Sequence, residues 1–216
     1  MMDEGLFAKI SACIFSGDLK AMEAHTRAAL QAGCQPSVII EKGLIPGMEK
    51  LGEDFGKGEA FLPELLIGAE AMKASLALLK PLLKSEEVKA KGTVVIGTVL
   101  GDVHDIGKNI VAWMLEGAGF NVVDLGVDVP PEKFIEAIKA NSPRILALSA
   151  LLTTSSHQIG KVIERLAEQG LRDNVKVLIG GASINPAYAE KVGADGYALD
   201  AVGAVVKARE LLGVRA

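Results

Sequence analysis

The spacing of apolar positions changes near residue 90 of the 216-residue chain. Before that point apolar side chains recur every three or four residues, as at Leu6, Ile10 and Ile14, which is the spacing of one helix face. Glycine-containing turns divide this half into four such stretches, with breaks at Gly17, Gly33 and 56–59. Residues 1–90 are therefore predicted to form a four-helix bundle, in which Pro46 interrupts or kinks the third helix.

The second half alternates short β-type runs with helical stretches. The predicted strands are 93–100, 121–125, 145–151, 175–179 and 196–199. The predicted helices are 108–117, 132–140, 156–168, 187–192 and 202–212. This alternation predicts an α/β fold with a parallel sheet covered by helices on both faces. Five strands favour the flavodoxin-like, Rossmann-like order, in which a ligand lies beyond the carboxyl ends of the first and third strands.

A charged, turn-rich segment, 85–92, lies between the two halves and is interpreted as a linker. The predicted domains are therefore a helical bundle cap, 1–90, and a ligand-binding α/β domain, 91–216.

Composition excludes several function classes. The net charge is −4 with no basic run, so a nucleic-acid-binding surface is not expected. No apolar run approaches the roughly 20 residues that a membrane span needs. The two cysteines, Cys13 and Cys34, fit no metal-ligand spacing and are expected to pack among apolar side chains. With so few cysteines and no signal peptide at the amino end, a cytoplasmic location is expected.

The loops predicted to follow the strands share a small, polar and glycine-rich composition. They are 101–107, 149–155, 180–183 and 200–201. Because the carboxyl ends of parallel strands meet at one edge of the sheet, these loops are expected to form one crevice. Its composition suits a wide, flat, partly polar ligand.

His104 is the one histidine in the first of these loops. Taken alone, such a histidine is more often an ordinary surface residue. Asp102 changes this interpretation, because it can accept a hydrogen bond from one ring nitrogen and leave the other for a metal. Ser149, on the neighbouring strand, is expected to donate to Asp102. A protein-only metal site needs three or more ligands, whereas a macrocycle with its own equatorial ligands needs one.

Glycines next to these residues are expected to make room for a large group. Gly107 follows His104 at the start of a helix, and Gly180–Gly181 follows the fourth strand. A plain strand-to-helix turn is the alternative interpretation of Gly180–Gly181.

The three pieces together resemble a known signature. Asp102-x-His104-x-x-Gly107 is followed by 41 residues, then by Ser149-x-Leu151, then by 28 residues and Gly180–Gly181. This pattern is similar to the cobalamin-binding signature of methionine synthase, corrinoid carrier proteins and adenosylcobalamin mutases. The stretch 101–109 resembles the methyltransferase branch, and Phe61-Leu62-Pro63-Glu64-Leu65 resembles the helical cap of that branch.

The resemblance implies roles for individual residues. His104 would be the lower axial ligand to cobalt, in place of the cofactor's own dimethylbenzimidazole base, and Asp102 and Ser149 would complete a ligand triad. Phe61 and Leu62 would shield the methyl face. The residues implied to line the corrin or its nucleotide tail are Gly101, Val103, Asp105, Ile106, Gly107, Leu151, Thr153, Ser155, Gly180, Gly181 and Ala201.

The function implied is carriage of a methyl group on the cobalt of cobalamin. The chain would be the methyl-carrier subunit of a multi-component methyltransferase system rather than a complete enzyme. Its expected partners are a substrate-specific methyltransferase, a second methyltransferase that passes the group to an acceptor such as tetrahydrofolate or a thiol, and a reductive activator.

Three alternative protein classes fit the sequence less well. A cobalamin-based sensor would carry a DNA-binding domain, for which the helical half offers no room. A receiver domain would need an aspartate at the end of the third strand, where this chain has Ser149. A mutase subunit would lack the helical cap.

Overall fold

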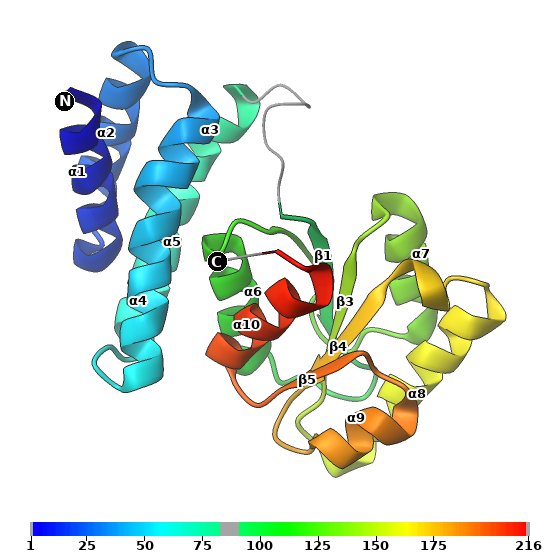
Figure 1. Cartoon of the computed structure of the whole chain (residues 1–216). Helices are drawn as coiled ribbons and strands as arrows, with labels where there is room; N and C mark the ends of the chain where they lie inside the picture. Colours follow the sequence, from blue (N-terminus) through cyan, green and yellow to red (C-terminus); the bar gives the residue numbers. More distant parts are fainter. Residues whose placement is uncertain (1, 83–90, 215–216) are drawn as a thin grey trace. The chain divides into compact units, whose positions relative to one another are not determined.

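The structure is a computed structural model that describes residues 2–82 and 91–214 (Figure 1). The chain divides into two compact units, Met1–Lys89 with Gly117–Gly119 and Ala90–Glu116 with Phe120–Ala216. Most of the predicted linker, 85–92, lies outside the described residues, and so does the predicted boundary at residue 90. The domain boundary therefore stays a prediction.

The first unit consists of helices whose apolar faces meet in a common core. They are α1 (Met2–Ser16), α2 (Leu19–Gln31), α3 (Pro36–Ile39), the π-helical turn η1 (Ile40–Leu44), α4 (Ile45–Lys57), α5 (Leu62–Leu79) and the 3₁₀ turn η2 (Lys80–Leu82). Ile10 and Ile14 on α1, Met22 on α2 and Leu65 on α5 are fully buried. With α3, η1 and α4 counted as one helix, these are the four helices that the periodicity predicted.

The third helix of the bundle contains a widened turn in place of a break. The backbone N–H of Ile45 donates to the carbonyl of Ile40, which is the bond that defines a π-helical turn. Pro46 follows immediately and has no N–H to donate, but it lies in the first turn of α4, where no donor is needed. The predicted interruption is therefore limited to this one turn.

The second unit is built on one parallel sheet. Its strands are β1 (Thr93–Thr98), β2 (Asn121–Asp124), β3 (Ile145–Ser149), β4 (Lys176–Gly180) and β5 (Gly196–Ala198). Their order is β2-β1-β3-β4-β5, which confirms the predicted flavodoxin-like topology. At the carboxyl edge, one row of paired residues joins Thr98, Ser149, Gly180 and Ala198. The loops that follow these four residues therefore leave the sheet at the same edge.

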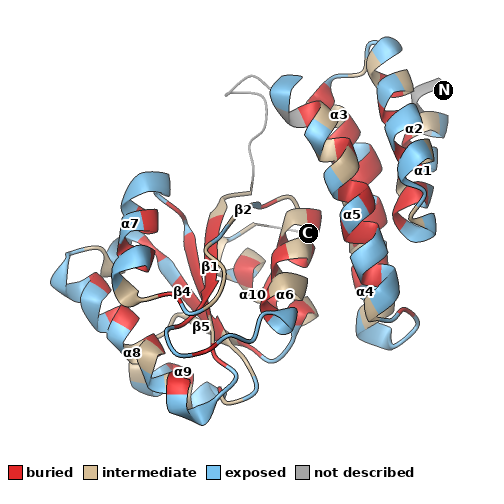
Figure 2. Ribbon diagram, turned by 180° about the vertical axis from the view of Figure 1, so that it is seen from behind, coloured by how far each residue is buried: buried red, intermediate tan, exposed pale blue. Residues whose placement is uncertain are grey.

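Helices cover both faces of this sheet. They are α6 (Ile106–Gly117), α7 (Pro131–Asn141), α8 (Thr153–Glu168), the 3₁₀ turn η3 (Arg172–Asn174), α9 (Pro186–Val192) and α10 (Ala201–Leu212). Figure 1 shows α6 and α10 on one face and α7 and α8 on the other. The central strands are accordingly buried along most of their length (Figure 2). No helix in residues 2–82 or 91–214 is long and apolar enough to cross a membrane.

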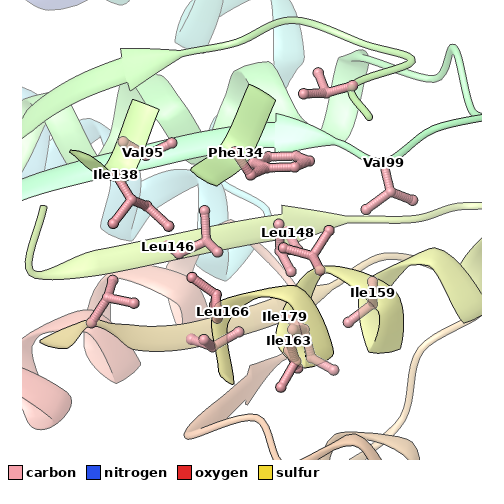
Figure 3. Close-up of a cluster of buried hydrophobic side chains, with 14 of the residues drawn as sticks. Val95, Val99, Phe134, Ile138, Leu146, Leu148, Ile159, Ile163, Leu166 and Ile179 are labelled. Atoms are coloured by element: carbon pink, nitrogen blue, oxygen red, sulfur yellow. The ribbon is translucent and has the colours of Figure 1, made fainter. Parts of the chain in front are cut away.

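The core between the sheet and helices α7 and α8 shows which strand residues point to that face of the sheet. Figure 3 shows Phe134 of α7 against the sheet, with Leu148 of β3 in the same cluster. Gly97 of β1 faces Phe134 so closely that a Cβ there would lie 2.8 Å from its ring. Because successive strand residues point to opposite faces, Ser149, which follows Leu148, points toward the α6 and α10 face.

Candidate functional site

The loop after β1 holds Asp102 and His104 in one hydrogen-bonded pair. The Nδ1 atom of His104 lies 2.7 Å from Oδ1 of Asp102, and the backbone N–H of His104 donates to the same oxygen at 3.1 Å. Asp102 is fully buried, whereas the side chain of His104 is 49% exposed. Across the described residues Nε2 of His104 has no hydrogen-bond partner. The pair therefore engages Nδ1 and leaves Nε2 without a partner in the described part of the chain, which is the arrangement that a metal-ligating histidine requires.

The second carboxylate oxygen of Asp102 joins this loop to the start of α8. Oδ2 accepts hydrogen bonds from the backbone N–H groups of Leu151 and Leu152, at 2.8 and 3.1 Å, and from the hydroxyl of Ser155 at 2.7 Å. Helix α8 begins at Thr153, three residues before the predicted start, which brings Ser155 into its first turn. Asp102 thus accepts five hydrogen bonds and stabilises the contact between the β1 and β3 loops.

The hydroxyl that donates to Asp102 is that of Ser155, and the expected bond from Ser149 is absent among the described residues. Ser149 ends β3 and points toward the α6 and α10 face. Ser155 lies on α8, which covers the opposite face. Sequence reasoning missed this role because Asp102 and Ser155 are 53 residues apart and their contact depends on which face each element covers.

Two opposing effects act on the Asp102 carboxyl. Burial by itself would raise the pKa of Asp102, because it disfavours the charged form. The hydrogen bonds from Ser155, from the His104 ring and from the backbone of Leu152 and His104 outweigh burial and hold the pKa of Asp102 well below its usual range. Asp102 therefore stays an anion. Because an anionic carboxylate can only accept hydrogen bonds, Nδ1 of His104 carries the proton and donates to it.

Exposed apolar side chains surround the predicted crevice. Val103 is 69% exposed, Ile106 65% and Leu199 81%. Leu151 and Leu152 are each 40% exposed, on the loop after β3. All five follow the carboxyl ends of strands, so the edge of the sheet that carries His104 is rimmed by apolar surface. Such surface is typical of a ligand-binding or interaction site.

The predicted glycines differ in what surrounds them. At Gly107, in the first turn of α6, an added Cβ would meet nothing within 4 Å. At Gly181, where φ is +122°, it would lie 2.1 Å from the carbonyl oxygen of Ala150, and at Gly180 it would lie 2.9 Å from that of Ala198. Gly180 and Gly181 are therefore required by the packing of the chain itself, whereas Gly107 leaves open space beside the His104 loop.

The remaining predicted lining residues lie on the same edge with different exposure. Asp105 is exposed and accepts a hydrogen bond from the Asn109 side chain at 3.2 Å. Thr153 is the exposed first residue of α8, and Ala201 is the buried first residue of α10. Gly101 has a φ of +80° and its N–H donates to Asp128, a residue that sequence reasoning missed.

The predicted shield residues belong to the helical unit. Phe61 precedes α5 and is 65% exposed, and Leu62 is the first residue of that helix. The backbone N–H of Phe61 donates to the side chain of Glu64 at 3.1 Å, which closes the first turn of α5. The assignment of Phe61 and Leu62 to a methyl-shielding surface stays a prediction.

Comparisons with known proteins identify both halves of the chain. Residues 92–206 match a family described as B12 binding domain, and residues 6–80 match a second family of the same description. The two parts of the chain thus have the fold of a cobalamin-binding protein.

The relatives narrow the class further. The chain is 45% identical to the trimethylamine corrinoid protein of Methanosarcina barkeri over 98% of both chains. It is 46% identical to dimethylamine corrinoid protein 1 of Methanosarcina acetivorans, covering 98% of this chain and all of the relative. The crystal structure of the methanol:cobalamin methyltransferase complex MtaBC from Methanosarcina barkeri matches with a TM-score of 0.89 and 33% identity, covering 97% of this chain and 80% of that chain. The chain belongs to the family of B12-binding corrinoid proteins, which confirms the resemblance seen in the sequence motifs.

Proposed function

We propose that this protein carries a methyl group on the cobalt of cobalamin between two methyltransferases. The observation that carries the proposal is the half-exposed ring of His104, held by a buried and anionic Asp102 within a B12-binding fold. When bound, the corrinoid supplies a cobalt centre that accepts and donates methyl groups, so the hard chemistry belongs to the cofactor. The chain supplies a ligand, a crevice and a docking surface.

His104 suits the role of lower axial ligand with the cofactor's own base displaced. Its Nδ1 carries the proton that faces Oδ1 of Asp102, so Nε2 keeps its lone pair for cobalt. One histidine suffices because the corrin supplies the equatorial ligands. The open space at Gly107 and the apolar side chains of Val103 and Ile106 suit the edge of a large macrocycle.

The Asp102 carboxylate holds the proton of His104 in place. With Ser155, Leu151 and Leu152 donating to Oδ2, Asp102 has little basicity left to take a proton from Nδ1. His104 would therefore hold the cofactor through Nε2, while its Nδ1 proton stays on the side of Asp102. In this arrangement Ser155 has the role that the sequence assigned to Ser149.

The relatives support methyltransferase partners. Their names refer to trimethylamine and dimethylamine, which favours a methylated amine as the methyl donor bound on the first partner. A second methyltransferase would pass the group to an acceptor such as tetrahydrofolate or a thiol. A reductive activator would restore the cobalt after accidental oxidation.

The decisive experiment loads the protein with cobalamin and examines the cobalt(II) form by electron paramagnetic resonance. Labelling the protein with 15N-histidine should change the nitrogen hyperfine pattern, because the axial nitrogen then comes from the chain and not from the cofactor. His104→Ala should abolish this dependence, while His157→Ala, which changes an exposed histidine on α8, should leave it intact. A pattern that ignores the label in the parent protein would contradict the assignment.

A methyl-transfer assay distinguishes the carrier function from the alternative function as a sensor. A carrier loaded with methylcobalamin should lose its methyl group to a corrinoid-to-acceptor methyltransferase and its acceptor in repeated turnovers. Binding without any transfer would favour a cobalamin-binding sensor or regulatory module.

A further inference from the structure

Asp128 has an unusual backbone conformation beside the His104 loop. It lies between β2 and α7 with a φ of +54°, in the left-handed region that L side chains other than Asn and Asp seldom adopt. The residue is exposed, so burial of its side chain does not explain the conformation. Strained backbone of this kind persists where neighbouring contacts hold it.

Two hydrogen bonds tie Asp128 to the loop that carries His104. The carboxylate oxygen Oδ1 of Asp128 accepts from the backbone N–H of Gly101 at 2.7 Å. The backbone N–H of Asp128 donates to the carbonyl of Asp102 at 2.9 Å. Asp128 therefore binds the N–H of Gly101 and the carbonyl of the adjacent Asp102. Gly101 and Asp128 are 27 positions apart in the sequence.

The rest of the loop is anchored to the same strand region. The hydroxyl of Thr98 donates to the carbonyl of His104 at 2.9 Å, and Val99 forms an isolated bridge with Val129, next to Asp128. The backbone of the turn is thus fixed from outside, and the Asp102 side chain then orients the half-exposed His104 ring. A shift of the Gly101–Asp102 peptides would move the carboxylate that aims Nε2.

We infer that Asp128 is a positioning residue for His104: its carboxylate holds the Gly101–Asp102 turn so that Nε2 faces outward before any corrinoid binds. The inference rests on the proposed function, in which His104 ligates cobalt. Preorganisation of this kind spares the binding step the cost of ordering the loop. Its loss should weaken axial ligation more than it weakens the fold.

Two substitutions of Asp128 distinguish the effect of its carboxylate from the effect of its backbone conformation. Asp128→Gly removes the acceptor but suits a positive φ, so it relieves strain while breaking the bond to Gly101. Asp128→Asn keeps an oxygen acceptor and tolerates the left-handed region, so it serves as the rescue variant. Ser142→Gly is the matched control, because Ser142 is the other described non-glycine residue with positive φ, at +43°, and follows α7 away from the site.

The first readout uses the protein without cofactor. In 15N-histidine-labelled protein, the Nδ1–H of His104 that donates to Asp102 should give a distinct nuclear magnetic resonance signal. We expect this signal in the parent, in Asp128→Asn and in Ser142→Gly. In Asp128→Gly it should broaden or shift toward the values of exposed histidine, with a melting temperature no lower than that of Ser142→Gly.

The second readout is axial ligation in the cobalt(II) protein. The measured quantity is the ratio of protein whose cobalt lacks a histidine nitrogen to protein whose cobalt has one. Asp128→Gly should raise this ratio by about tenfold, the order expected for one lost charge-assisted hydrogen bond. Asp128→Asn should stay close to the parent. The inference is overturned if Asp128→Gly keeps the parental signals in both readouts, or if Asp128→Asn loses them to the same extent. If the parent itself lacks histidine ligation, the proposed function fails, and the cofactor-free resonance still decides whether Asp128 positions His104.

Discussion

The hydroxyl of Ser155 donates a hydrogen bond of 2.7 Å to Oδ2 of Asp102 and thereby joins the first turn of α8 to the loop after β1. Both groups are buried, with relative exposures of 2% and 0%. A buried carboxylate that loses a donor keeps its charge and its desolvation cost, so this bond is expected to matter to the fold as well as to the site.

Ser155→Ala should lower the free energy of unfolding of the cofactor-free protein by about 1.5–3 kcal/mol, the range for a hydrogen bond to a charged group. Ser149→Ala is the control, because no hydrogen bond of the Ser149 hydroxyl is found among the described residues, and it should cost less than about 1 kcal/mol. Urea denaturation measures both. Equal losses in the two variants would show that Ser155 has no special relation to Asp102.

Gly107 and Gly181 should respond in opposite ways to an added side chain. Gly107→Leu places the side chain in open space, so it should leave the melting temperature of the cofactor-free protein nearly unchanged and reduce cobalamin affinity. Gly181→Ala adds a Cβ against the Ala150 carbonyl at a φ of +122°, so it should destabilise the cofactor-free protein by more than about 1 kcal/mol. Thermal melting and cobalamin titration test the pair, and a large loss of stability in Gly107→Leu would contradict open space at that position.

The low pKa of Asp102 has a consequence for stability. Because the folded-state pKa lies below the ordinary value of 3.8, the anion stabilises the fold at pH values above that ordinary pKa. This contribution should fall as the pH drops below about 4, where the unfolded chain begins to take up the proton. Denaturation of the parent and of Asp102→Asn at a series of pH values measures it as the difference between the two proteins. A difference that did not shrink with acid would mean that Asp102 has an ordinary pKa.

The predicted shield can be tested by light. If Phe61 and Leu62 cover the methyl face, Phe61→Ala or Leu62→Ala should speed photolysis of the protein loaded with methylcobalamin. Phe15→Ala is the control, since Phe15 is another exposed aromatic of the helical unit, at 42% exposure, without a predicted role. Absorbance during illumination gives the rate. If all three variants bleach at the parental rate, the shielding assignment is wrong.

Local patterns in the sequence predicted most of the fold. Periodicities of 3.6 and 2 residues are set by neighbours along the chain, so the helices and strands could be predicted without coordinates. The flavodoxin-like order was favoured by the number of strands and their alternation with helices. The pairing of Asp102 with His104 could be predicted for the same reason, since the two residues are separated by one position and share a loop. Gly107 borders open space, and its role in making room for a ligand stays a prediction.

The tertiary structure decided the contacts that join distant segments. Ser149 and Ser155 lie close together in the sequence, at the end of β3 and the start of α8. Which of the two hydroxyls reaches Asp102 is determined by the face of the sheet on which each one lies. The hydrogen bond from Gly101 to Asp128 joins two loops that the pairing of β1 with β2 brings together. The Ala150 carbonyl beside Gly181 is likewise set by the pairing of β3 with β4. Such contacts depend on strand parity and loop direction, which are properties of the packed chain and not of any local pattern.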